Sequence, residues 1–173
     1  DVAVANYTKT LGASVRGMKI GIINGYFDQG IVSAVRSAFD DALRTLKALG
    51  MKTQEIKIPH IDLVPAAQAA STRPEANSDH DNYLRTRPRD YSPGLLYNLI
   101  AGLLTPAPVY VTAQRVRRLI CQEFDEAFKS VHVILAPTIF SPAPTIEECK
   151  RGYIEADGKT INLQDRAGNF LTR

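Results

Sequence analysis

Hydrophobic residues occur along this chain in two patterns, short apolar runs and longer stripes at helical spacing. Residues 18–23 (MKIGII) and 131–136 (VHVILA) are short apolar runs, and the alternation in residues 53–58 (TQEIKI) places Ile56 and Ile58 on one face. Short runs rich in β-branched residues are typical of buried strands. We therefore predict a strand in each of these three ranges.

Between the first two strands, apolar residues recur every three or four positions, which predicts an amphipathic helix. Its stripe consists of Ile31, Val35, Ala38, Ala42, Leu46 and Leu49. Asp28 is the expected N-cap, because its carboxylate can accept a hydrogen bond from an early backbone N–H, and Gly50 is the expected end. Burial of so few side chains does not offset the entropy of ordering about twenty residues, so we expect the stripe to pack against a sheet. A strand, a helix and a strand at this spacing predict a parallel βαβ unit.

The positions after the second strand predict three further helices. Residues 61–70 form a short helix, residues 95–104 an apolar helix, and residues 110–129 the most regular helix of the chain. The stripe of the last helix consists of Ala113, Val116, Ile120, Phe124, Ala127 and Phe128. Residues 71–93 are polar and contain several prolines, so we expect mostly irregular chain there.

These patterns divide the chain into three parts. Residues 1–16 are predicted to be an arm, residues 17–138 an α/β segment, and residues 139–173 an irregular tail rich in proline and charge. Within the tail, Asp157 and Gly158 separate two short β-rich segments, which predicts a β-hairpin. We expect the α/β segment to form a mostly parallel or mixed β-sheet flanked by helices.

Composition restricts the partners and the location of the protein. With 45% hydrophobic and 23% charged residues, the 173 residues fit an ordinary globular domain. No run approaches the roughly 20 apolar residues of a membrane helix, so we expect no membrane. Arg115, Arg117 and Arg118 cluster without interleaved aromatic residues, which favours a solvated helix face over a nucleic-acid site. Two cysteines, of which Cys121 is predicted to be buried, and no visible secretory signal favour the cytoplasm.

The residues contain no local catalytic or metal signature. A serine nucleophile needs a base and convergent backbone donors beside it, and no serine here lies in a Gly-x-Ser-x-Gly elbow. His60, His80 and His132 are too far apart in the sequence for a local metal motif. A polar loop explains the acidic residues around His80 better than a cation site does. We therefore assign no catalytic residue, no metal ligand and no cofactor site.

Several motifs occur in the order found in one enzyme family. Residues 17–22 (GMKIGI) are similar to the strand that opens the second half of amidase-signature enzymes, commonly written GLRIGV, and residues 135–138 (LAPT) are similar to the LxPT motif that ends a later strand. Other positions that follow the family pattern include Gly50, Pro59, Glu75, His80, Arg87, Asp90, Gly102, Phe124, Asn169 and Phe170. The chain resembles the carboxyl-terminal half of an amidase-signature hydrolase, similar to bacterial amidases and to the A subunit of glutamyl-tRNA amidotransferase.

The resemblance implies a fold and a reaction. The family fold is a mixed β-sheet between layers of helices, and the family reaction cleaves a carboxamide C–N bond through an acyl-serine intermediate. The nucleophilic serine, the bridging serine and the lysine base lie upstream of the matched region, so the resemblance gives this chain no catalytic residue. It implies no cofactor, a small-molecule amide as the substrate of a full-length parent, and no activity of this chain alone.

Four residues are candidates for contact with that substrate, namely Tyr91, Tyr110, Pro137 and Thr138. They are chosen because loops at the carboxyl ends of parallel strands face ligand crevices. For the two tyrosines, packing is the competing interpretation. For Thr138, the competing interpretation is a hydrogen bond that caps the local backbone after Pro137.

Two other interpretations also fit the sequence. One is a non-catalytic Rossmann-like domain for binding or scaffolding. The reading frame upstream of Asp1 distinguishes this interpretation from an amidase segment, because only an amidase needs a nucleophile segment there. The other interpretation is self-association, because a sheet cut from a larger one has unpaired edges that can pair with a second copy.

Overall fold

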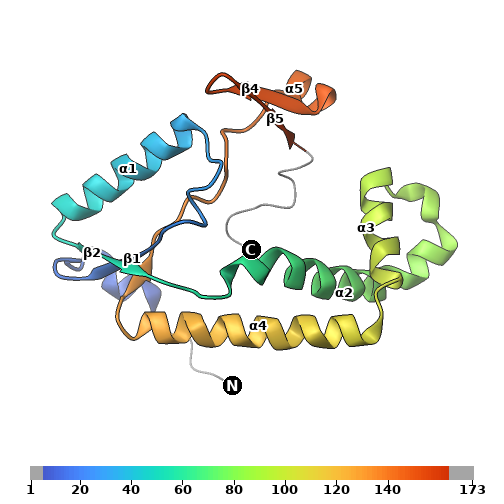
Figure 1. Ribbon diagram of the computed structural model, residues 1–173, viewed down its shortest axis with the longest axis horizontal. Helices are drawn as coiled ribbons and strands as arrows, with labels where there is room; N and C mark the ends of the chain where they lie inside the picture. The colour runs from blue at the N-terminus through green and yellow to red at the C-terminus, as the bar shows by residue number, and fades with distance from the viewer. Residues whose placement is uncertain (1–5, 164–173) are drawn as a thin grey trace.

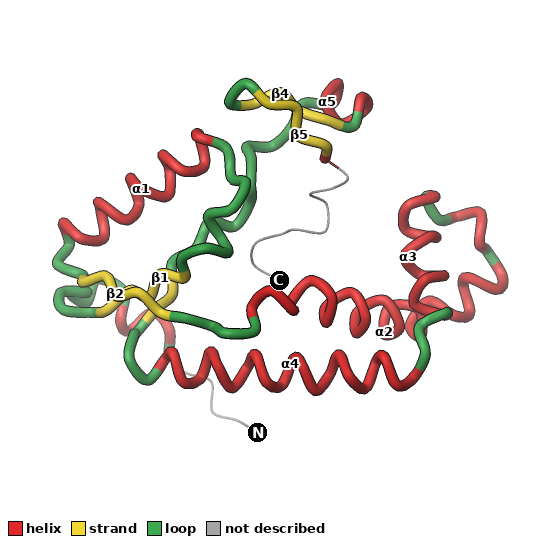
Figure 2. The backbone as a smooth tube through the Cα atoms, viewed as in Figure 1, coloured by secondary structure: helices red, strands yellow, loops and turns green. Residues whose placement is uncertain are grey.

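The structure, a computed structural model, describes residues 6–163 and contains a three-stranded parallel sheet (Figure 1). β1 (Lys19–Ile23) is the central strand, with β2 (Lys52–Ile56) on one side and β3 (Val133–Ile134) on the other. Both outer strands run parallel to β1. Figure 2 shows that helices make up most of the remaining chain. The predicted α/β fold with a parallel sheet and flanking helices is confirmed.

The middle of β1 forms the tightest part of the sheet. Ile20 lies opposite Thr53 of β2 and Val133 of β3, and its side chain is completely buried. Gly21 follows, and a β-carbon there would lie 2.7 Å from the Cδ1 atom of Ile56. Glycine therefore lets the Ile56 side chain pack directly on the β1 backbone.

One hydrophobic core joins the sheet to α4 (Ala107–Phe128). Its buried members are Ile23, Phe27, Ile56, Ile58, Ile61, Ile120 and Val131. Val116 and Phe124 of α4 pack against this core while partly exposed. The predicted apolar stripe of α4 therefore faces the core, except at its carboxyl end, where Phe128 is 48% exposed.

Cys121 of α4 is exposed, so the prediction that it is buried is wrong. It follows the buried Ile120 by one position, which turns it about 100° around the helix and away from the stripe. α3 (Pro93–Leu103) confirms the predicted apolar helix and meets α4 at a bend of 99°. Over residues 6–163, no single helix is long and apolar enough to cross a membrane, and α3 and α4 meet that test only as a bent pair.

α1 (Ser33–Ala48) connects β1 to β2, but it packs much less closely than predicted. None of its residues is buried, and Ala38 and Ala42 of the predicted stripe are exposed. In Figure 1 this helix lies well away from α2 and α4. The expectation that its stripe packs against a sheet is therefore wrong for the described residues, where even Val35 and Leu46 of the stripe are only half-buried. The helix ends as predicted at Gly50, which has a φ of +91°.

The N-terminus of α1 is capped by a residue from a distant part of the chain. Val32 occupies the N-cap position and has no side-chain acceptor. Asp28, the predicted cap, instead accepts a hydrogen bond from the backbone N–H of Gly25 at 2.9 Å. The Asp157 carboxylate accepts from the Ser33 backbone N–H at 2.7 Å and from the Ser33 hydroxyl at 2.5 Å. A cap separated from its helix by 124 positions cannot be recognised from local sequence.

α2 (Val64–Thr86) corrects the largest error of the sequence analysis. We expected a helix over residues 61–70 and irregular chain over residues 71–93. The structure instead has a 3-10 turn, Ile61–Leu63, followed by one continuous helix of 23 residues with Pro74 in its interior. A proline there removes one main-chain hydrogen bond and usually breaks or kinks a helix.

Tertiary packing holds α2 together across this proline. The amide of Asn77, which is buried, donates a hydrogen bond to the Leu99 carbonyl of α3 at 3.1 Å. Gly102 of α3 lies so close to α2 that a β-carbon on it would overlap the Arg73 carbonyl, directly before Pro74. α3 and α4 both pack along α2, so their contacts override the local preference of the sequence.

β3 is shorter than the predicted strand over residues 131–136. The pairing continues on both sides of it, because the backbone N–H of His132 donates to the Lys19 carbonyl at 2.9 Å and that of Leu135 donates to the Gly21 carbonyl at 3.0 Å. Beyond β3, the chain forms the short helix α5 (Ile146–Arg151). α5 begins with a capping box made by Thr145 and Glu148, a signal that the sequence contains and that we did not use.

The predicted hairpin is formed by β4 (Tyr153–Ala156) and β5 (Lys159–Asn162), which pair antiparallel. Asp157 and Gly158 make the turn with φ angles of +52° and +71°, as a two-residue hairpin loop requires. The division of the chain into parts at residues 16 and 138 stays a prediction. The matched residues Asn169 and Phe170 lie outside the described residues.

Candidate functional site

The loops that follow the three strands leave the sheet at one edge, because all three strands are parallel. Ligands of open α/β sheets bind outside this carboxyl edge. We define the candidate site as the segments that leave it, residues 24–30 after β1, residues 57–63 after β2 and residues 135–138 after β3. We call this region the carboxyl edge.

Tyr26 is the aromatic side chain that the β1 loop contributes to the carboxyl edge. It is half-buried against the core and meets the ring of Phe27 edge-on, with centroids 5.0 Å apart. Burial raises the pKa of the Tyr26 hydroxyl, and the negative charge of Asp62 raises it further. The loops after β1 and β2 therefore place a neutral phenol and a carboxylate near each other.

A network of hydrogen bonds fixes the turn that carries Tyr26. The Asp28 carboxylate accepts from the Gly25 backbone N–H, and Gly25 adopts a φ of +84° to make this turn. The Gln29 side chain donates to the Gly25 carbonyl. The guanidinium of Arg36, on α1, donates to the Asp28 carbonyl at 2.9 Å. The turn is thus tied to the first part of α1.

The loop after β2 is tied to α4 in a similar way. The Glu123 carboxylate accepts from the His60 backbone N–H at 3.0 Å and lies 2.5 Å from the Nδ1 atom of the His60 ring. Burial alone would raise the pKa of Glu123, but the hydrogen bonds and charge of His60 lower it below its usual value. This pair holds the segment that leads to Asp62 and then to α2.

Pro137 and Thr138 follow β3 at the carboxyl edge, as predicted from their place after a strand. Pro137 is buried and Thr138 is exposed. Among residues 6–163, no hydrogen bond involves the Thr138 hydroxyl, so the alternative in which Thr138 caps the local backbone has no support. The hydroxyl is therefore available to a ligand at this edge.

Tyr91 and Tyr110 lie elsewhere, against α2. The Tyr91 hydroxyl is 2.8 Å from the Nδ1 atom of His80, and the two rings meet edge-on. The Tyr110 hydroxyl donates to the Glu75 carboxylate at 3.0 Å. Each hydroxyl thus has a partner on α2, as expected if both rings contribute to packing.

The structure does not bring the four predicted substrate residues together. Tyr110 is at the start of α4, roughly 28 Å along the helix axis from the end that leads into β3. In Figure 1, α3 and the start of α4 lie at the opposite end of the molecule from the sheet. Pro137 and Thr138 share the carboxyl edge, whereas Tyr91 and Tyr110 do not reach it. A role in substrate contact stays a prediction for all four residues.

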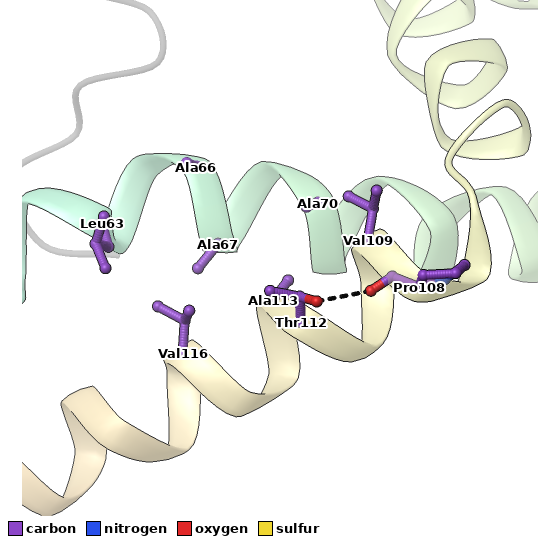
Figure 3. Close-up of a pocket in the computed structure, with 9 residues that line it drawn as sticks. All are labelled: Leu63, Ala66, Ala67, Ala70, Pro108, Val109, Thr112, Ala113 and Val116. Atoms are coloured by element: carbon purple, nitrogen blue, oxygen red, sulfur yellow. Dashed lines mark hydrogen bonds between the residues drawn. The ribbon is translucent and has the colours of Figure 1, made fainter.

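An apolar groove of about 420 Å³ lies between α2 and α4 (Figure 3). Its lining consists of Leu63, Ala66, Ala67, Ala70, Pro108, Val109, Thr112, Ala113 and Val116. The hydroxyl of Thr112 donates to the Pro108 carbonyl within α4, so the groove offers almost no free polar group. Such a surface can hold an apolar group, but it cannot perform acid–base or nucleophilic chemistry.

The described residues do not form a nucleophile with its base. Ser71 donates to a carbonyl of its own helix, Ser130 donates to the Ala127 carbonyl at the end of α4, and Ser141 donates to the neighbouring Pro142 carbonyl. Ser33 donates to the Asp157 carboxylate, but no imidazole or amine between residues 6 and 163 bonds to it. Nor do these residues include a group of at least three His, Cys, Asp or Glu side chains that could hold a metal ion.

Tyr26 and Asp62 are the residues of the carboxyl edge that the sequence analysis did not select. The signal was present, because each follows a predicted strand by a few positions. We applied that rule to the third strand and not to the first two. The coupling between the two side chains depends on the parallel β1–β2 pairing, which brings their loops together.

Comparison with known proteins places these features in a family. A family model described as Amidase matches residues 2–169. The A subunit of the glutamyl-tRNA(Gln) amidotransferase of Geotalea daltonii is 32% identical over 172 residues, which cover 86% of this chain and 36% of the relative. An amidase of Pseudomonas putida is 32% identical over 143 residues, covering 83% of this chain and 31% of the relative. The chain thus spans about a third of the length of these curated relatives.

Solved structures agree with the sequence matches. An inhibitor-bound structure, described as a vestigial protein complex that reveals the origins of an s-triazine catabolic enzyme, superposes with a TM-score of 0.79 at 27% identity. The superposition covers 94% of this chain and 34% of that one. These matches give no support to the alternative interpretation as a Rossmann-like binding domain.

Proposed function

The chain belongs to the amidase family, and from this premise we propose that it is the framework segment of an enzyme that hydrolyses a carboxamide C–N bond. In the proposed reaction, a serine hydroxyl of the parent enzyme attacks the amide carbonyl. The amine or ammonia then leaves, and water releases the acid from the acyl-serine intermediate. The resemblance places this serine and its base outside the matched region, so the present chain contributes structure and part of the pocket.

The family match over residues 2–169, combined with coverage of about a third of each relative, is the observation that carries the proposal. A match of this kind is expected when one segment of a larger catalytic body retains its fold. The carboxyl edge fits such a role, because it presents an exposed hydroxyl, a phenol and a carboxylate without any nucleophile of its own.

Within this proposal, Pro137 and Thr138 form one wall of the acyl-side pocket. Thr138 supplies a free hydroxyl there, and the buried Pro137 restricts the backbone that carries it. Tyr91 and Tyr110 do not contact the substrate directly, because their hydroxyls bond to His80 and Glu75 and so anchor the segment before α3 and the start of α4 to α2. Their removal should therefore affect stability more than substrate affinity.

The partners and location belong to the same proposal. The substrate of the parent is a small carboxamide, with no metal or organic cofactor, and the enzyme works in the cytoplasm. The isolated chain self-associates through the outer edges of β2 and β3, because each pairs with β1 on one side only within the described sheet. Light scattering that finds only monomers of the 173-residue chain at high concentration would contradict self-association.

A fluorophosphonate probe tests the catalytic part of the proposal, because it labels activated serines. The isolated chain should not be labelled. The complete polypeptide encoded by the gene should be labelled once, on a serine outside residues 1–173, and should release product from an aryl carboxamide. Labelling of a serine within the isolated chain, or failure of the complete polypeptide to react with both the probe and the amide, would refute the proposal.

A glutaminase component of a tRNA amidotransferase is the nearest variant of this function, and the Geotalea daltonii relative is named as part of such an amidotransferase. The two activities differ in the amide that is consumed. Release of ammonia from glutamine, measured beside hydrolysis of an aryl carboxamide, separates them. A strong preference for glutamine would assign the parent to the amidotransferase variant.

A further inference from the structure

We propose that Asp157 is a positioning residue, which ties the β4–β5 hairpin to the turn that carries Tyr26 and so sets the shape of the acyl-side pocket. Only the last step, from the turn to the pocket, rests on the proposed function. The link between the hairpin and the turn rests on contacts within this chain.

The first contact is the cap on α1. The first backbone N–H groups of a helix have no partner within the helix, and Val32 supplies none at the N-cap position. The Asp157 carboxylate takes this place with one oxygen on the Ser33 backbone N–H and the other on the Ser33 hydroxyl. A negative charge at this end of a helix is favoured by the helix dipole. α1 therefore obtains its cap only while the hairpin is docked.

The second set of contacts runs from α1 to the turn. Arg36 is one turn along from Ser33, and its guanidinium donates to the Asp28 carbonyl. The Asp28 carboxylate in turn holds the Gly25 backbone N–H, which directly precedes Tyr26. If the first turn of α1 frays, Arg36 loses its position, and residues 24–30 lose the contact that ties them to α1.

A third contact adds the loop after β3. The Val32 backbone N–H donates to the Phe140 carbonyl at 2.9 Å, so the residue before α1 is tied to the chain just beyond Thr138. The start of α1 is therefore a junction between the β1 loop, the β3 loop and the hairpin. Because Asp157 caps this junction, it acts on two of the three loops at the carboxyl edge, those after β1 and β3.

The backbone conformation and the charge of Asp157 both fit a residue that holds the start of α1. Asp157 is the one non-glycine residue with a positive φ among residues 6–163. Aspartate tolerates this conformation better than most residues, but it still costs energy relative to an extended one. Hydrogen bonds from Ser33, through its hydroxyl and its backbone N–H, lower the pKa of Asp157, so the carboxylate is charged near neutral pH.

Hydrogen–deuterium exchange of the 173-residue chain tests the link independently of activity. Asp157→Ala removes the acceptor and the charge, whereas Asp157→Asn keeps an acceptor oxygen. Exchange in the first turn of α1 and in residues 24–30 should become about fivefold faster in Asp157→Ala, with a smaller change in Asp157→Asn. Exchange in α2 and α4 should stay unchanged, which shows that the variant has folded.

Glu155→Gln is the matched control, because Glu155 lies on the same hairpin and accepts only from the Thr160 hydroxyl among the described residues. It should leave exchange in α1 and residues 24–30 as in the wild type. Unchanged exchange in these segments in Asp157→Ala would overturn the link, as would equal effects of Glu155→Gln and Asp157→Ala.

Kinetics of the complete polypeptide test the last step. Asp157→Ala should raise KM for carboxamides with a bulky acyl group at least about tenfold while kcat changes less, because the pocket wall is displaced and the nucleophile is intact. Asp157→Asn should recover part of the loss. Faster exchange with an unchanged KM would refute the positioning role. If the complete polypeptide hydrolyses no carboxamide, the proposed function fails, and the exchange experiment still decides the link.

Discussion

α1 and α4 are both amphipathic helices with a regular apolar stripe, but only the stripe of α4 includes buried residues. α4 turns its stripe to the sheet and to α2, and Ala113 and Ile120 are buried there. α1 has no buried residue, although its apolar positions recur just as regularly. At its start α1 is capped by Asp157, and at its end Gly50 adopts a left-handed φ of +91°. An apolar stripe therefore shows that a helix requires a partner, and it does not show where that partner lies.

The difference in burial between α1 and α4 fits a chain that matches only part of its relatives. The relatives are about three times longer than the part of them that this chain matches. α4 has its partners within the matched third, whereas we infer that the partner of α1 belongs to the remainder of the parent. The comparison thus divides the chain into a part with its own core and a helix without one.

The largest difference is expected between Ile120→Ala in α4 and Leu46→Ala in α1. Ile120 is 7% exposed and leaves a cavity in the core when truncated, so the free energy of unfolding should fall by about 2–5 kcal/mol. Leu46 is only half-buried, on a helix that has no buried residue, so its truncation should cost about 1 kcal/mol or less. Urea denaturation followed by circular dichroism measures both. Equal losses would contradict the division.

A smaller but specific effect is expected from Gly102→Ala. The new methyl group would overlap the Arg73 carbonyl of α2, so α3 must shift, at a cost of about 1–3 kcal/mol. Gly94→Ala is the matched control, because a β-carbon at Gly94 would meet no atom within 4 Å beyond its chain neighbours and the nearby backbone of its own helix. This control should leave stability unchanged or raise it slightly, since alanine favours helix. A neutral Gly102→Ala variant, measured by thermal denaturation, would mean that α2 and α3 are not in close contact.

The sequence predicted the elements whose signals are local. The β-rich runs that became β1 and β2, the stripe of α4, the left-handed end at Gly50 and the turn at Asp157–Gly158 all follow from neighbouring residues. The family resemblance rested on the same local motifs. Their order along the chain was sufficient to identify the family, although no single motif is specific.

The errors at α2 and at the start of α1 share a physical cause, because both depend on contacts between distant residues. α2 continues past Pro74 because α3 and α4 pack along it, and a local rule can only recognise the proline. The cap of α1 comes from Asp157 rather than from Asp28. At the site, Pro137 and Thr138 reached the expected edge, whereas the distance to Tyr110 depends on the direction of α4, which the sequence does not specify.

Acid should weaken the contacts of α4 and of α1 through two different carboxylates, Glu123 on α4 and Asp157 at the start of α1. The pKa values of Glu123, beside His60, and of Asp157, beside Ser33, are lowered in the folded protein. Each group therefore stabilises the fold above the unfolded carboxylate pKa of about 4, and this contribution is lost as the pH falls through the lower folded value. Glu123→Gln and Asp157→Asn should each be less stable than the wild type at pH 7, and the difference should narrow below about pH 4.

Denaturation at a series of pH values measures the stability difference between each variant and the wild type. Hydrogen–deuterium exchange shows which segment is loosened. Glu123→Gln should loosen α4 near the β2 loop, and Asp157→Asn should loosen the start of α1. Glu126→Gln is the control, because Glu126 is on α4 in an exposed pair with Lys129. A difference from the wild type that stays constant from pH 7 to pH 3 would show that neither carboxylate contributes through its charge.

The smallest effect in the isolated chain is expected from Ala42→Glu, in the exposed stripe of α1. Because Ala42 contacts no close partner here, its substitution should change stability by no more than about 0.5 kcal/mol. In the complete parent polypeptide, the same glutamate would be buried, at a cost of about 2 kcal/mol or more. Ala48→Glu, which lies off the stripe, controls for the effect of a charge on this helix. If Ala42→Glu and Ala48→Glu destabilise the parent equally, the stripe of α1 has no partner there, and its pattern reflects helix formation alone.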